Sequence, residues 1–85
     1  MKIYTLLYHE DSIDDTSSSK VLNAFTTQEE AHAAMKGKLQ EKTDELEVTE
    51  GDIDCGEVVT YIDGTDASLC HYGSYYSWTI QEFEV

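Results

Sequence analysis

The last third of the chain constrains the fold most, because two short loops there separate three strand-like segments. Gly64-Thr65 and Gly73-Ser74 are two-residue loops of the Gly-x kind, which favour tight β-hairpin turns. Side chains directly opposite each other across a hairpin point to the same face of the sheet. Both hairpins therefore predict the same inner face, made of Val58, Thr60, Ile62, Ala67, Leu69, His71, Tyr76, Trp78 and Ile80.

The outer face of this predicted meander mixes hydroxyl groups and aromatic rings. It contains Val59, Tyr61, Ser68, Cys70, Tyr72, Tyr75, Ser77, Thr79 and Gln81. Trp78 is expected at the centre of the core, opposite Leu69. The strict alternation fails after Ile80, and Phe83 and Val85 continue the inner face only if one residue bulges out near residues 81–82.

The first third predicts two more strands. Residues 2–9 carry apolar side chains on both alternating faces, which is typical of a strand inside a sheet. Residues 10–19 are polar and turn-rich, so a mobile loop is expected there, followed by a strand over residues 20–26.

A helix is predicted next, because Thr27 and Glu30 have the spacing of a capping box. It should begin at Gln28 and end near Glu47. Its apolar stripe consists of Ala31, Met35, Leu39 and Leu46, with the alkyl stem of Lys42 covering the gap. The sequence thus predicts a single α+β domain over residues 1–85, with the order ββαβββ and one helix packed on an antiparallel sheet.

The charge of the chain excludes some partners. Eighteen acids, five lysines and no arginine give a net charge of −13. Such a chain should repel nucleic acid and anionic lipid, so a basic protein surface is the expected partner. The sequence contains no run of 18 apolar residues, so no membrane-spanning helix is predicted. A cytoplasmic location is expected. The sequence leaves the oligomeric state open.

The acids are concentrated in residues 41–57, which contain eight acids and one lysine. These acids are Glu41, Asp44, Glu45, Glu47, Glu50, Asp52, Asp54 and Glu57. On a helix, the first three recur about 5–6 Å apart and resemble a line of phosphates. One hypothesis is that this segment occupies the nucleic-acid-binding groove of a basic protein. The alternative is that acidity serves solubility and that Tyr61, Tyr72 and Tyr75 on the outer sheet face bind a partner.

Metal, cofactor and catalytic sites are not expected. Asp52, Asp54 and Asp63 fit positions 1, 3 and 12 of a calcium loop, but Gly56 and Glu57 break the pattern. A second acidic group, Glu10, Asp11, Asp14 and Asp15, should remain hydrated. Cys70 and His71 are neighbours on a strand and point to opposite faces, so zinc is not expected. No motif marks a nucleophile, and we expect a protein that is not an enzyme.

Three stretches resemble proteins of one kind. KIYTLLYHED, AFTTQEEAHAAM and YSWTIQEFEV resemble segments of short phage and gut-bacterial proteins of unknown function. In size, acidity and α+β plan, the chain is also similar to phage-encoded inhibitors of bacterial defence, such as anti-CRISPR and anti-restriction proteins. Many of those inhibitors imitate DNA. The resemblance therefore implies an inhibitor and assigns no residue.

Overall fold

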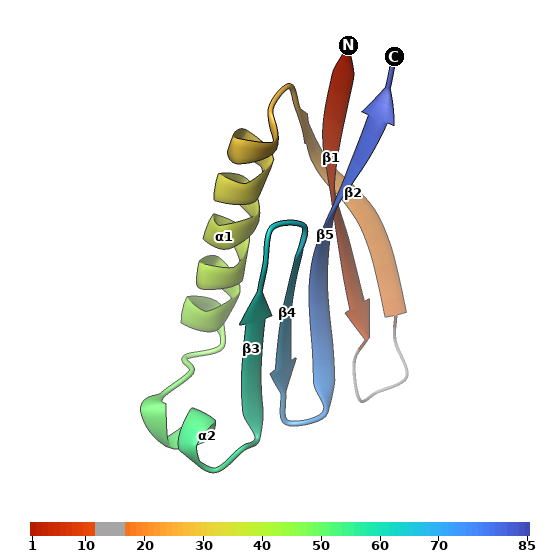
Figure 1. Cartoon of the computed structure of the whole chain (residues 1–85). Coiled ribbons are helices and arrows are strands. Elements are labelled where there is room, and N and C mark those ends of the chain that lie inside the picture. Colours follow the sequence, from red (N-terminus) through yellow and green to blue (C-terminus); the bar gives the residue numbers. More distant parts are fainter. Residues whose placement is uncertain (12–16) are drawn as a thin grey trace.

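The computed structural model describes residues 1–11 and 17–85, which form one antiparallel sheet and a main helix (Figure 1). The elements are β1 (Lys2–Asp11), β2 (Ser17–Phe25), α1 (Gln28–Glu45), α2 (Glu50–Asp54), β3 (Val58–Ile62), β4 (Asp66–His71) and β5 (Ser74–Glu84). The strand order is β2-β1-β5-β4-β3, so β5 is the central strand and β2 and β3 are the edges. The predicted ββαβββ plan is confirmed, and the short helix α2 is added to it.

The core lies between α1 and one face of the sheet. It consists of Leu6, Ala31, Met35, Val58, Ala67, Leu69, Trp78 and Ile80. Trp78 is 2% exposed, and its ring lies 5.4 Å from the ring of Tyr8. The predicted helix stripe is confirmed, and so is the inner face, except that Thr60 and Ile62 on the edge strand β3 are exposed. Lys42 behaves as expected, since its side chain is largely buried and its ammonium lies 5.0 Å from the ring of Tyr76.

The second hairpin turns one residue earlier than the sequence suggested. His71 pairs with Ser74, so Tyr72 and Gly73 form the turn, with φ angles of 47° and 92°. Positive φ at both turn residues gives the backbone twist that suits a two-residue hairpin. The pairing of β4 with β5 is therefore shifted by two residues from the predicted register. Trp78 lies opposite Ala67, so the prediction that it lies opposite Leu69 was wrong. A shift of two leaves every strand side chain on its predicted face.

β5 has no bulge near residues 81–82, so the condition under which Phe83 would join the inner face is not met. β5 pairs with β1 without interruption from Tyr75 to Glu84, and this continuous ladder keeps β5 in strict alternation. Phe83 therefore points to the outer face, opposite Ile3, where it is exposed. The described register shift lies between β1 and β2, at Leu6 and Leu7.

The polar segment between the first two strands is shorter than expected. β1 continues to Asp11 and β2 begins at Ser17, so both strands extend into the predicted loop at residues 10–19. Glu10 and Asp11 therefore lie on a strand. Asp14 and Asp15 lie outside the described residues.

Candidate functional site

Helix α1 is capped at both ends by residues next to it in the sequence. The Thr27 hydroxyl accepts a hydrogen bond from the Glu30 backbone N–H at 3.2 Å and donates to the Glu30 carboxylate at 3.0 Å. At the other end, Glu47 N–H bonds to the Asp44 carbonyl and Val48 N–H bonds to the Thr43 carbonyl, which is a Schellman motif. The helix therefore ends at Glu45, two residues before the predicted end. Glu47 adopts φ 53°, a conformation that glycine usually supplies.

A second capped helix follows, in a segment beyond the predicted helix for which no element was expected. Thr49 and Asp52 form a complete capping box: each side chain accepts a hydrogen bond from the other residue's backbone N–H. The Thr49-x-x-Asp52 spacing repeats that of Thr27-x-x-Glu30 and could have predicted α2. Residues 50–54 are therefore ordered as a helical turn.

Tyr72 joins α2 to the end of the sheet. Its hydroxyl donates a hydrogen bond of 2.5 Å to Asp52, and its backbone N–H bonds to the Glu57 carbonyl at 3.0 Å. The bond from Tyr72 lowers the pKa of Asp52, with further help from the Thr49 backbone N–H. The same bond raises the pKa of Tyr72 to about 12. Asp52 is thus a carboxylate fixed in position at neutral pH. Figure 1 shows α2 at the end of the sheet where the β4–β5 turn lies.

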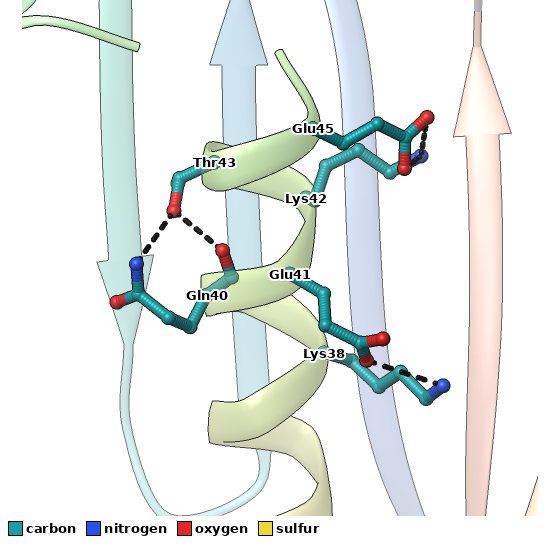
Figure 2. A network of polar contacts seen from close by, with 6 residues as sticks. All are labelled: Lys38, Gln40, Glu41, Lys42, Thr43 and Glu45. Carbon is teal, nitrogen blue, oxygen red and sulfur yellow. Dashed lines mark hydrogen bonds and ion pairs between the residues drawn. The ribbon is translucent and has the colours of Figure 1, made fainter. Parts of the chain in front are cut away.

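The acids on α1 are largely engaged within the helix. Figure 2 shows Lys38 beside Glu41 and Lys42 beside Glu45, at 3.3 Å and 3.4 Å between nitrogen and oxygen. The Gln40 amide donates to Asp44 at 3.0 Å and to the Thr43 hydroxyl at 3.3 Å. The row predicted from Glu41, Asp44 and Glu45 is present, but two of its charges face lysines.

The least compensated charge lies beyond α1. Residues 47–57 contain five acids and no lysine. We call this set the acidic tip; it consists of Glu47, Glu50, Asp52, Asp54 and Glu57. Within residues 1–11 and 17–85, no ion pair involves any of them, and all but the half-buried Asp52 are exposed. Of the eight predicted acids, the structure therefore places five on a segment without cations.

The three tyrosines of the alternative site do not form one cluster. Tyr61 and Tyr75 lie exposed on the outer face, on β3 and β5. Tyr72 lies in the turn and bonds to α2, because the hairpin turns one residue earlier than predicted. The Tyr61 hydroxyl donates to Asp63 at 2.6 Å, which raises the pKa of Tyr61 and lowers that of Asp63.

A hydrogen-bonded chain of Ser19, His9 and Asp11 crosses from β2 to β1. His9 Nδ1 lies 2.7 Å from the Ser19 hydroxyl, and His9 Nε2 lies 2.9 Å from Asp11. These residue types also occur in nucleophilic relays, and sequence reasoning did not connect them. The side chains of His9 and Asp11 are both open to water. We interpret the chain as a surface hydrogen-bond network that links two strands.

The candidate metal ligands are separated by the fold. Asp52 lies before β3 and Asp63 after it, and five extended residues span about 16 Å. In the described part of the chain, no three His, Cys, Asp or Glu side chains form a group that could hold a metal ion. Cys55 and Cys70 are free thiols.

Among the described helices, none has the length and apolar character needed to cross a membrane. No protein-family model matches the sequence, and no match was found among curated proteins or solved structures.

Proposed function

We propose that this chain is a non-enzymatic inhibitor whose residues 41–57 occupy a basic, nucleic-acid-binding surface of another protein. The proposed mode is that of anti-CRISPR and anti-restriction proteins that imitate nucleic acid, acting in the cytoplasm. The observation that carries the proposal is the acidic tip: five acids and no cation on a segment that is held in place.

Preorganisation is the physical reason why such a segment would bind well. A flexible acidic loop loses conformational freedom when it binds, and that loss lowers its affinity. Here the Schellman motif, the Thr49 capping box and the Tyr72–Asp52 bond already fix the backbone between Glu47 and Glu57. A fixed array of carboxylates can therefore meet a fixed array of lysines and arginines, as phosphates do. Charge complementarity of this kind also speeds association.

Displacement of nucleic acid tests the proposal directly. The protein would be titrated into CRISPR effectors and restriction enzymes that carry a fluorescent DNA, and release of the DNA would be followed by anisotropy. A triple variant, Glu47→Gln, Glu50→Gln and Asp54→Asn, should lose the displacing activity. The matched control, Glu29→Gln, Glu82→Gln and Glu84→Gln, removes the same charge elsewhere and should retain it. Equal loss in both variants would show that only net charge matters.

A second candidate function is a small interaction domain that binds through the outer sheet face. The observation that favours it is the exposure of Tyr61 and Tyr75 on a face that no helix covers in the described residues. Charge reversal at Glu45 and Glu47 to Lys, compared with Tyr61→Ser and Tyr75→Ser, separates the two candidates by which pair abolishes binding.

A further inference from the structure

The sheet has one covered and one open face. α1 packs on the face that carries Leu69 and Trp78, and no described element lies on the other. We call that other side the outer face; on the central strand β5 it presents Tyr75, Ser77, Thr79, Gln81 and Phe83. Several of the large exposed apolar side chains lie on it, namely Val21, Val59, Tyr61, Tyr75 and Phe83. An exposed apolar surface of this kind is typical of an interaction site.

The outer face also carries few charged side chains on its strands. None of its five side chains on β5 is charged, although the chain carries a net charge of −13. On the strands of this face, the described acids are Asp11 and Asp66, which lie at strand ends. Another copy of this chain could approach most other surfaces only by bringing acid against acid. At the outer face, it would meet hydroxyl groups and apolar side chains instead.

The shape of the outer face suits packing against a second copy related by a two-fold axis. On the β1–β2 side, a hollow of about 430 Å³ is lined by Leu7, Val21, Ser77 and Thr79, among others. On the β3–β4 side, the exposed ring of Tyr61 lines a second hollow of about 390 Å³, which Asp63 and Asp66 also line. Two outer faces can pack together about a two-fold axis that lies between them, parallel to β5. Rotation about this axis places the β3–β4 side of one copy over the β1–β2 side of the other, so that Tyr61 of each copy lies over the β1–β2 hollow of its partner.

The area of the face is sufficient for a stable contact. The molecule measures 44 × 26 × 17 Å along its principal axes. A stable dimer buries about 800 Å² on each partner. A face of these dimensions can supply that area, and aligned packing of two antiparallel sheets is a common architecture.

We propose that the outer face binds a second copy of this chain, giving a two-fold symmetric dimer in which the sheets pack face to face. This inference identifies a second copy of the chain as the partner of the surface described under the second candidate function. It does not depend on what the acidic tip binds. Because the two copies repel each other through their net charge, salt should strengthen the dimer. Salt should weaken binding by the acidic tip, so the two proposals fail independently.

Sedimentation equilibrium tests this inference, with Val21→Glu and Ile53→Glu as matched variants. Both replace an exposed branched apolar side chain, 62% and 51% exposed, and both add one negative charge. Val21 lies on the outer face and Ile53 lies on α2. At about 1 M salt, where the Debye length is about 3 Å, the wild-type chain and Ile53→Glu should be dimers. Val21→Glu should be a monomer with an unchanged circular dichroism spectrum.

Several outcomes would overturn the inference. One is a wild-type chain that stays monomeric at about 100 μM in high salt, since a functional dimer should form well below that concentration. Another is equal dissociation of the two variants, which would place the contact elsewhere. If Val21→Glu does not fold, Tyr61→Ser replaces it, because the exposed Tyr61 ring makes no contribution to the core. A dimer unaffected by Tyr61→Ser and by Val21→Glu would also contradict the proposed face.

Discussion

Trp78 is the residue on which the core depends most. It is 2% exposed, contacts the ring of Tyr8 and lies on the central strand under α1. Trp78→Ala should lower the free energy of unfolding by about 3–5 kcal/mol, because a large buried side chain leaves a cavity. Tyr75→Ala, on the outer face of the same strand, should cost less than about 1.5 kcal/mol. Urea denaturation of both variants measures the difference, and similar costs would contradict the assignment of the two faces.

Glu47 combines a charge of the acidic tip with an unusual backbone conformation. Its φ of 53° is costly for a residue with a Cβ, whereas glycine adopts it freely. Glu47→Gly should therefore raise the free energy of unfolding by about 0.5–1 kcal/mol relative to Glu47→Ala. Both variants remove the carboxylate, so their difference isolates the backbone effect. A glycine variant that is less stable than the alanine variant would contradict this explanation.

At the scale of elements, the Tyr72–Asp52 bond is the contact that fixes α2 on the sheet. Tyr72→Phe removes only the hydroxyl, so amide hydrogens of residues 50–56 should exchange faster while the core of the sheet stays protected. Tyr61→Phe is the matched control, because Tyr61 donates a similar bond to Asp63 away from α2. Hydrogen exchange by mass spectrometry measures both variants. Unchanged exchange at residues 50–56 in Tyr72→Phe would show that other contacts hold α2.

The same bond predicts a dependence on alkaline pH. The pKa of Tyr72 is raised from 10.0 to about 12 by the bond to Asp52, so this bond stabilises the fold below pH 10.0. Its contribution is lost as the pH rises from 10.0 to about 12. Tyr8, whose pKa is raised to about 12 mainly by burial, adds to the same loss. Tyr72→Phe should thus lose less stability across this range than the wild-type chain, as followed by urea denaturation.

The sequence predicted those elements whose signals were local and repeated. The two hairpins implied the same inner face, and the capping residue Thr27 marked the start of α1. The register of the second hairpin was missed because Tyr72 accepts a positive φ that sequence rules assign to glycine or asparagine. The face of Phe83 could be given only conditionally, because it depends on a long-range ladder with β1. The bond between Tyr72 and Asp52 joins residues twenty positions apart and had no sequence signal.

At the scale of the whole molecule, the net charge of −13 opposes the compact state. Salt should therefore raise the melting temperature through screening, which requires no binding site. Calcium and magnesium chloride at equal ionic strength should raise it equally, as measured by differential scanning calorimetry. A rise of several degrees specific to calcium would contradict this and would point to a site that includes Asp52, Asp54 and Asp63.

The dissociation constant of the complex with a basic effector, measured at two salt concentrations, tests the proposed function most directly. Calorimetric titration would compare the wild-type chain with the triple variant at Glu47, Glu50 and Asp54. For the wild-type chain, we expect the dissociation constant to rise roughly tenfold or more between about 50 and 200 mM salt, because charge contacts to a polyanion-binding groove are screened. The triple variant should bind more weakly and depend less on salt. A wild-type affinity that does not change with salt would contradict binding through the acidic tip.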